Sequence, residues 1–268
     1  LTFVALLVLF VSYLILPVFY NKADISRELE AKLLSHLDLN FKISNNLNYN
    51  IFPTPHFNIL DTSIIYENQK ISQINNLKIF ISLENLFSLK KTNIKKVAIE
   101  NANFNFNKIN YNFFIKILDS EFSLVKLKIK NSNIFFRNND NEVLFINKIK
   151  NMKYYYDLKE LKNILHSENE IFNIPYSIKI SKSKDNEKIL SKVNINLFKI
   201  QMQNELSYIG TNKIGKLNII HNKLKREITY ETNKNYFKFN FYDKLDNSNF
   251  FYKGFLNFNP FYSSFIGK

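Results

Sequence analysis

Hydrophobic and polar positions divide the chain into three parts with different spacing. In the first part, residues 1–20 (LTFVALLVLFVSYLILPVFY) carry no charge. In helical conformation, about 20 such residues span roughly 30 Å, the thickness of the hydrocarbon core of a bilayer. We therefore predict a membrane-spanning helix. Its lipid-facing anchor residues are expected to be Leu1, Phe3, Leu6, Leu9, Phe10, Leu14, Leu16 and Phe19.

The apolar run is expected to stay on the protein rather than be cleaved. A secretory signal has a shorter apolar stretch and ends in a small-x-small cleavage site. Residues 21–24 (NKAD) offer no such site. This favours a retained, single-pass anchor.

The second part, residues 22–37, has the spacing of an amphipathic helix. Asp24 or Ser26 is a candidate cap for its start, and Leu34 widens its apolar stripe. We expect this helix to plug the proximal end of the sheet that follows. The stripe recurs every four residues, at Ile25, Leu29, Leu33 and Leu37.

In the third part, from residue 39 onward, apolar and polar residues alternate. This period of two predicts strands with one apolar and one polar face. Phe and Tyr, which suit a pleated surface, supply much of the apolar face. The clearest alternating segments are residues 39–43, 47–51, 77–83, 174–180, 193–197, 237–241 and 250–258.

Between these segments lie short stretches rich in Asn, Asp and Lys, which predict hairpin turns. They are residues 45–46, 138–141, 182–186 and 243–249. Two further stretches, residues 84–90 and 157–168, have the spacing of short helices.

The predicted fold is mainly β. A transmembrane anchor (residues 1–20) and a short amphipathic helix (residues 21–38) precede a β-rich domain (residues 39–268) built as a long antiparallel meander. Its apolar face has to be covered by a second sheet, by helices or by lipid. The helical sequence after residue 40 is too short to cover it. Either a trough or a two-sheet sandwich therefore remains open.

The order of features in residues 22–106 resembles the N-terminal region of AsmA-like proteins. A helix leads into two strands, and the second strand ends in Phe52-Pro53-Thr54-Pro55. An apolar strand ending near Asp61 follows, and then a strand and turn over residues 77–87. The glycine that usually precedes the first strand of the family is missing. The chain is also short for the family, which implies either a truncated or a small member.

This resemblance implies a function. The family is anchored in the bacterial inner membrane and carries a groove-like β domain in the periplasm, where larger relatives are implicated in moving phospholipid for outer-membrane biogenesis. By that analogy, membrane phospholipid is the expected ligand, and Phe52, Pro53, Pro55 and Asp61 form the family's turn. Which strand face is apolar depends on the register. Candidate groove-lining residues are Ile79, Ile81, Ile178, Ile180, Phe237, Phe239 and Phe241.

A second hypothesis stays open beside the first. The same anchored β domain would also suit a cell-envelope scaffold, or an outer-membrane protein assembly factor, that contacts envelope proteins and carries no lipid. An outer-membrane β-barrel is disfavoured by the uncharged N-terminal segment and by the lysine-rich turns.

The net charge of +14 does not by itself indicate a nucleic-acid partner. The chain is rich in Asn, Lys, Ile, Phe and Tyr and poor in Gly and Trp, a bias expected from AT-rich codons. Its lysines are spread along alternating strand positions rather than clustered on one helix. We expect no nucleic-acid partner, and attraction to anionic lipid headgroups fits the anchor better.

Residues that would carry catalysis are not found in a usable arrangement. Residues 210–216 (GTNKIGK) match the glycine and lysine spacing of a phosphate-binding loop, but Leu217 replaces the Ser or Thr that holds magnesium. We interpret this segment as a hairpin. The chain has no Cys, and its four His residues lack metal-binding spacing. The prediction is a protein without enzymatic activity, metal or cofactor.

Overall fold

A computed structural model describes residues 2–107, 124–138, 140–183, 188–245, 248–258 and 260–267 of the chain. Its helical elements are α1 (Thr2–Ile15), η1 (Leu16–Phe19), α2 (Lys22–Leu37), η2 (Leu89–Lys91) and η3 (Asn196–Phe198). The first eight strands are β1 (Asn40–Lys42), β2 (Leu47–Asn50), β3 (His56–Tyr66), β4 (Gln69–Ile81), β5 (Ile94–Phe106), β6 (Lys126–Arg137), β7 (Val143–Asp157) and β8 (Lys162–Ile171). The others are β9 (Ile174–Ser183), β10 (Lys188–Ile195), β11 (Ile200–Ile209), β12 (Asn212–His221), β13 (Leu224–Thr232), β14 (Tyr236–Leu245), β15 (Ser248–Phe258) and β16 (Phe261–Gly267).

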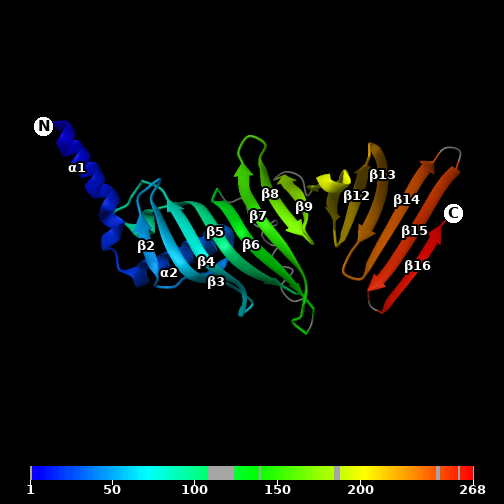
Figure 1. The fold of residues 1–268 in the computed structure, drawn as a ribbon, viewed down its shortest axis with the longest axis horizontal. Coiled ribbons are helices and arrows are strands. Elements are labelled where there is room, and N and C mark those ends of the chain that lie inside the picture. Colours follow the sequence, from blue (N-terminus) through cyan, green and yellow to red (C-terminus); the bar gives the residue numbers. More distant parts are fainter. Residues whose placement is uncertain are drawn as a thin grey trace. The chain divides into compact units, whose positions relative to one another are not determined.

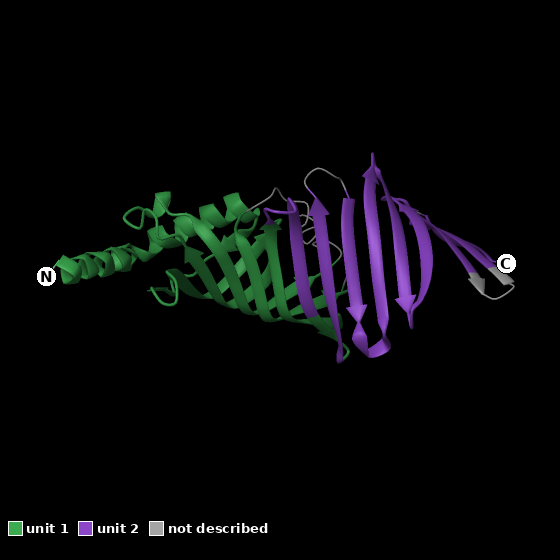
Figure 2. Ribbon diagram, turned by 90° about the horizontal axis from the view of Figure 1, so that it is seen from above, with its two compact units in different colours: residues 1–156, 169–172 green, residues 157–168, 173–268 purple. Residues whose placement is uncertain are grey.

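The strands form one sheet, and their order in it follows their order in the chain (Figure 1). β1 and β2 both pair with β3, and from β3 onward each strand lies beside the next as far as β16. The mainly β prediction is confirmed. Contacts divide the chain into two compact units (Figure 2). Unit 1 comprises residues 1–156 and 169–172, and unit 2 comprises residues 157–168 and 173–268.

The expected antiparallel meander is interrupted between β5 and β6. β5 and β6 are parallel, with Lys96 opposite Lys126 and Phe104 opposite Ile134. Parallel neighbours need a crossover connection of a dozen or more residues, which a tight turn cannot replace. Residues 107–125 form this connection, and most of them lie outside the described residues.

Three of the four predicted turns, residues 138–141, 182–186 and 243–249, lie between consecutive antiparallel strands. Residues 139, 184–187 and 246–247, in and next to these turns, lie outside the described residues. Residues 45–46 do not form the predicted hairpin, because β1 and β2 both pair with β3 instead of with each other.

The two short helices predicted after residue 80 are wrong. In residues 157–168, the Asp157 carboxylate accepts hydrogen bonds from the backbone N–H groups of Lys159 and Glu160, and Leu161 has a left-handed φ of 50°. These features make a turn that leads into β8. In residues 84–90, Asn85 is left-handed, and the only helical turn is η2.

The predicted amphipathic helix is confirmed as α2, with the expected bounds. Its first turn is capped by the Asn21 side chain, which accepts a hydrogen bond from the N–H of Ala23, and not by Asp24 or Ser26. Leu34 is exposed and lies outside the buried stripe. Figure 1 shows α2 running behind the first strands of unit 1. The four stripe residues Ile25, Leu29, Leu33 and Leu37 are buried.

The core of unit 1 lies between α2 and one face of its strands. Leu29 and Leu33 are fully buried, as are sheet residues from three neighbouring strands. These include Phe57, Ile59, Leu77, Ile79, Val97 and Ile99.

Shortening a stripe residue tests this packing. We expect Leu29→Ala to lower the free energy of unfolding of unit 1 by about 2–5 kcal/mol, because it leaves a cavity in the core. Leu34→Ala makes the same chemical change on the exposed side of α2 and should change it by less than about 0.5 kcal/mol. Thermal unfolding of the full chain in detergent measures both. Equal losses would contradict the assigned face.

A row of residues crosses the strands of unit 1 and interrupts their alternation. The row contains Asp61 in β3, Asn75 in β4, Asn101 in β5, Asn131 in β6 and Lys150 in β7. The paired residues on either side of the row show that each of its members lies opposite the next. The members themselves are not paired with one another in any of the four strand pairs. Three of the five, Asp61, Asn101 and Asn131, have left-handed φ angles of 55°, 56° and 47°. Asn and Asp tolerate this conformation better than other residues with a side chain.

The interruption changes which residues of a strand are buried. In β5, Val97 and Ile99 are buried before the row, and Ala102 and Phe104 after it. The buried set therefore changes from odd to even positions. β3 changes in the same way, from Phe57 and Ile59 to Thr62 and Ile64.

A side chain supports the backbone where the ladder is interrupted. The hydroxyl of Ser132 accepts a hydrogen bond from the buried N–H of Ala102 at 3.0 Å and donates one to the carbonyl of Lys130 at 2.8 Å. The freed N–H is thereby satisfied, as a buried donor requires.

The five residues are called the left-handed row below, after the backbone of three of them. Substitutions at Asn101 test the role of this backbone conformation. Asn101→Val should destabilise unit 1 by about 1–2 kcal/mol or more, because a β-branched residue pays the full steric cost of a left-handed φ. Asn101→Gly should be tolerated, since glycine adopts this conformation freely.

The matched control is Asn103→Val, on the same strand at an exposed position without a left-handed φ. Denaturant unfolding compares the three variants. A loss at Asn103 as large as that at Asn101 would show that the left-handed backbone is not the cause.

Candidate functional site

Unit 2 has two chemically different faces, and the pairing register assigns residues to them. Val193 is opposite both Ile178 and Met202, and Ile228 is opposite Phe241. Opposite residues project to the same side of a sheet, and so do residues two apart in a strand. The apolar face of unit 2, named so below, carries Tyr176, Ile178, Ile180, Ile189, Val193, Ile195, Ile200, Met202, Leu206, Tyr208, Leu217, Ile219, Leu224, Ile228, Tyr230, Phe237, Phe239, Phe241, Phe250, Tyr252, Leu256, Phe261 and Phe265.

The opposite face is mostly charged or polar. It holds the ion pairs Lys188–Glu205, at 2.7 Å, and Lys216–Glu227, at 2.8 Å. Aromatic residues join this face only in the last three strands, at Tyr236 and Tyr242 in β14, Phe251 and Phe255 in β15 and Tyr262 in β16. Its scattered aliphatic members include Leu190, Ile214, Ile220 and Ile266. Other members of the polar face are Lys179, Ser181, Lys192, Asn194, Gln201, Gln203, Asn218, Thr229, Glu231, Lys238, Asn240 and Lys253.

In the described part of unit 2, no helix or second sheet covers the apolar face. The helical element η3 is a single turn, and its Leu197 and Phe198 are themselves exposed. Apolar side chains of the strands are half-buried by their own neighbours instead, as in Ile178, Met202 and Phe239. A few polar groups interrupt the face, including the Arg226–Asp243 ion pair at 2.8 Å.

Glycines allow aromatic rings to lie flat on the apolar face. A Cβ on Gly215 would lie 2.0 Å from the ring of Tyr230, its partner across the strand pair, and a Cβ on Gly254 would lie 2.0 Å from the ring of Phe239. The Tyr230 ring crosses β12 over Gly215, and its hydroxyl donates to Asn204 Oδ1 on β11 at 3.0 Å. Only the absence of a side chain leaves room for these rings.

The structure brings together five of the seven predicted groove residues and separates the other two. Ile178, Ile180, Phe237, Phe239 and Phe241 all lie on the apolar face of unit 2. Ile79 and Ile81 are buried in the core of unit 1, with 0% and 5% of their surface exposed, and are not free to line a groove.

Sequence reasoning missed the glycine positions, although the signal was present. The chain has four glycines, and Gly215 and Gly254 interrupt otherwise apolar alternation. A glycine at an inward position of a strand commonly marks a close approach by another group.

The other predicted residues are placed as follows. The segment Thr2–Phe19 is long and apolar enough to cross a membrane and is almost entirely exposed; Leu1 lies outside the described residues. The Phe52–Pro53 peptide bond is cis, and Phe52 is 87% exposed. Asp61 does not end its strand, because β3 continues to Tyr66 and Asp61 belongs to the left-handed row. Gly210 makes the turn of the β11–β12 hairpin, as expected.

Tyrosine hydroxyls fasten the end of the anchor to unit 1. Tyr13 donates to the carbonyl of Leu83 at 2.8 Å and accepts the N–H of Leu86 at 3.0 Å. Tyr49 on β2 donates to the carbonyl of Leu14 at 3.0 Å. Burial raises the pKa of Tyr49 to about 12, so its phenol stays a protonated donor well above neutral pH.

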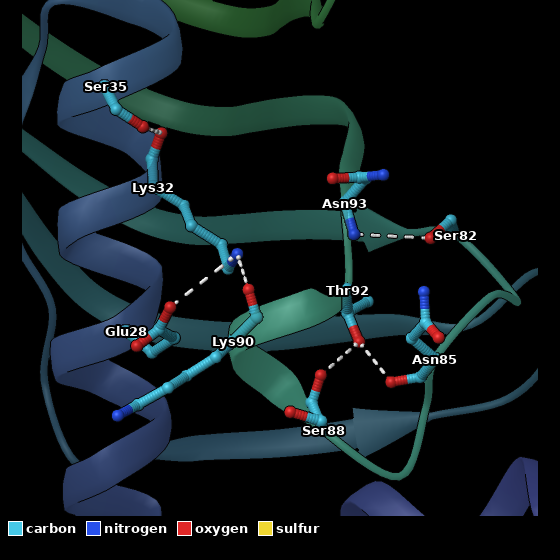
Figure 3. A network of polar contacts seen from close by, with 9 residues as sticks. All are labelled: Glu28, Lys32, Ser35, Ser82, Asn85, Ser88, Lys90, Thr92 and Asn93. Atoms are coloured by element: carbon cyan, nitrogen blue, oxygen red, sulfur yellow. Dashed lines mark hydrogen bonds and ion pairs between the residues drawn. The ribbon is translucent and has the colours of Figure 1, made fainter.

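The loop between β4 and β5 is held internally as well (Figure 3). The Thr92 hydroxyl lies 2.9 Å from the carbonyl of Asn85 and 3.1 Å from that of Ser88. Lys32 of α2 donates to the carbonyl of Lys90 at 2.9 Å and lies 3.6 Å from Glu28. The loop is thus attached both to the anchor and to α2.

Within the described residues, no group of three or more His, Asp or Glu side chains is arranged to hold a metal ion. Comparison with protein-family models and with curated proteins gave no match for this chain.

A double-mutant cycle tests the ring over Gly254. Gly254→Val should destabilise the full chain, since the new side chain overlaps the Phe239 ring. In the background of Phe239→Ala the same change should cost at least about 1 kcal/mol less, because the overlapping ring is gone. Thermal unfolding gives the coupling energy. Additive effects would show that the ring does not lie over the glycine.

Removing one hydroxyl tests the attachment of the anchor. Tyr13→Phe should speed hydrogen exchange of the Leu86 amide, which loses its acceptor, and lower stability by about 0.5–1.5 kcal/mol per lost bond. Tyr262→Phe, at an exposed position in β16, is the control. Unchanged exchange at Leu86 would contradict the assigned hydrogen bond.

Proposed function

We propose that this chain is an AsmA-like, inner-membrane-anchored protein that binds or conducts phospholipid along the apolar face of unit 2. Its β domain would lie in the periplasm and serve outer-membrane and cell-envelope biogenesis. The observation that carries the proposal is a single-layer sheet whose apolar face is uncovered and whose other face is mostly polar. The separation of the two faces matters, because a sheet that binds nothing on its uncovered apolar face would expose that face to water at a cost in free energy.

The energetics favour an apolar ligand. Burying apolar surface gains about 25 cal/mol per Å², and apolar patches beyond a few hundred Å² are rarely left exposed without a use. Acyl chains match this face because they need no hydrogen bonds. The backbone behind the face is paired strand to strand, so few polar groups would be buried unsatisfied against lipid.

The proposed activity needs no catalytic residue. Side chains such as Phe239, Met202 and Ile180 would contact the acyl chain, while the headgroup would stay in water at the edge of the sheet. A curvature of unit 2 into a trough would increase this contact, and the flat rings over Gly215 and Gly254 would form part of its floor.

A second candidate function rests on the last strand. All residues of β16 are exposed, and among the described strands it pairs only with β15. Strand edges of this kind pair with other chains. An envelope scaffold or an outer-membrane protein assembly factor would use such an edge to hold a protein partner without carrying lipid.

Photocrosslinking separates these functions. The phenylalanine analogue p-benzoylphenylalanine would replace Phe239 or Phe241 on the apolar face, or Phe251 or Phe255 on the opposite face, in the full chain in bacterial membranes. We expect crosslinks to phospholipid from the first pair only, detected by mass spectrometry. Crosslinks to protein, or equal lipid crosslinks from both faces, would contradict lipid binding on the apolar face.

Charge substitution gives an independent prediction. Phe237→Asp, Phe239→Asp and Phe241→Asp together should abolish the lipid crosslink from a probe at Tyr252 on the same face. The control combines Tyr242→Asp, Phe251→Asp and Phe255→Asp, which place three carboxylates on the opposite face. Circular dichroism has to show that both variants keep their sheet.

A further inference from the structure

The loop that joins β4 to β5 carries large apolar side chains that are exposed rather than packed into the core of unit 1. Leu83 is 46% exposed and Phe87 is 61% exposed, whereas Leu86 between them is buried. The nearby β2–β3 loop exposes Phe52 to 87%. The two loops lie at the same end of the sheet, since the N–H of Ile81 at the end of β4 bonds to the carbonyl of Pro55.

Hydrogen bonds fix the position of this loop along the anchor. The carbonyl of Leu83 and the N–H of Leu86 are hydrogen-bonded to the Tyr13 hydroxyl. The carbonyl of Leu86 accepts a hydrogen bond from the Tyr20 hydroxyl, and the carbonyl of Lys90 accepts one from Lys32. As the loop proceeds, its partners move from Tyr13 in α1 to Tyr20, directly after η1, and then to Lys32 in α2. The loop therefore runs alongside the chain segment that leads out of the apolar helix.

Tyr13 lies well inside the uncharged part of the chain. From Tyr13 to Phe19 the helical rise amounts to roughly 10 Å, and the first charged residue is Lys22. If the bilayer reaches Phe19, the loop at Tyr13 lies below the membrane surface. If the bilayer reaches only Tyr13, the same loop rests on that surface. The anchor cannot insert without bringing Leu83 to the lipid.

The charge of this end of unit 1 fits a lipid surface. Lys90, Lys91, Lys95 and Lys126 are all exposed around the loop and the adjacent strand starts, and Glu84 is the one carboxylate within residues 83–87. A cavity of about 550 Å³ lies beside Leu83 and is lined in part by Lys95, Lys96 and Lys126. Apolar side chains surrounded by lysines are the pattern of segments that enter the interface and bind lipid phosphates.

We propose that the loop of residues 83–87, together with Phe52, is a second membrane-contact element in which Leu83 and Phe87 enter the acyl-chain region of the bilayer while the surrounding lysines contact lipid phosphates. This inference rests on the anchor assumed in the proposed function, but not on lipid binding by unit 2. It places the first strands of the sheet directly at the membrane surface.

The absence of Cys from the chain allows single labelling sites. In the full chain, reconstituted into vesicles of phosphatidylethanolamine and phosphatidylglycerol, Phe87→Cys and Leu83→Cys would carry an environment-sensitive nitrobenzoxadiazole dye. Nitroxide-labelled phosphatidylcholine serves as the quencher. Phe172→Cys, in the exposed β8–β9 turn, is the matched control, and Leu9→Cys reports on the anchor.

We expect strong quenching at residues 9, 83 and 87 and at least a several-fold weaker effect at residue 172. Quenching at residue 9 without quenching at residues 83 and 87 would overturn the membrane-contact element and leave the anchor intact. Absence of quenching at residue 9 would overturn both this inference and the anchored function. Quenching at residue 172 equal to that at residue 87 would also overturn the membrane-contact element, because contact with lipid would then not be specific to the loop.

Discussion

An apolar sheet face can be buried only as far as something covers it, and over the first strands of this protein the cover is α2. Sixteen residues of α-helix extend about 24 Å, which is enough to cross roughly five strands spaced about 4.8 Å apart. Among the described residues, the largest fully buried side chains belong to α2, the strands β1 to β5 and the loop after β4, as with Leu29, Phe57 and Ile99. Burial continues with slight exposure into β6, β7 and β8, at Leu127, Ile149 and Ile164. Among the described residues of unit 2, η3 is the only helical element, and from β9 onward the apolar side chains are half-buried or exposed. α2 thus accounts for the closed core over the first strands, and no helix of comparable length is described in unit 2.

Much of this architecture could be predicted because it depends on local spacing. The uncharged segment is long enough to be unambiguous, and the four-residue repeat of α2 continues over enough residues to be so as well. The alternation also placed Phe237, Phe239 and Phe241 on one face correctly, since that strand is regular. The prediction of a helix at residues 157–168 is wrong, because the spacing of its three leucines fits a turn followed by a strand as well as a helix. The hydrogen bonds of the Asp157 carboxylate decide the matter.

Other features depend on distant segments and could not be read from one strand. Ile79 and Ile81 have the same alternation as Ile178 and Ile180, yet the first pair is buried in the core of unit 1, and nothing described in unit 2 covers the second. The parallel pairing of β5 and β6 depends on the path of the intervening chain. The shift of alternation at Asn101 is visible in the sequence, but its meaning requires the neighbouring strands to shift at the same row.

The left-handed row has a consequence for how this sheet can change in evolution. If one strand lost its residue in the row, every side chain beyond that point would turn to the wrong face while the neighbouring strands stayed as they are. Loss from all five strands together would restore simple alternation and keep the faces matched. Single-residue deletions at Asp61, Asn75, Asn101, Asn131 or Lys150 are therefore selected against one at a time. The row can be inherited or lost only as a set, so related chains should either carry all five interruptions or none.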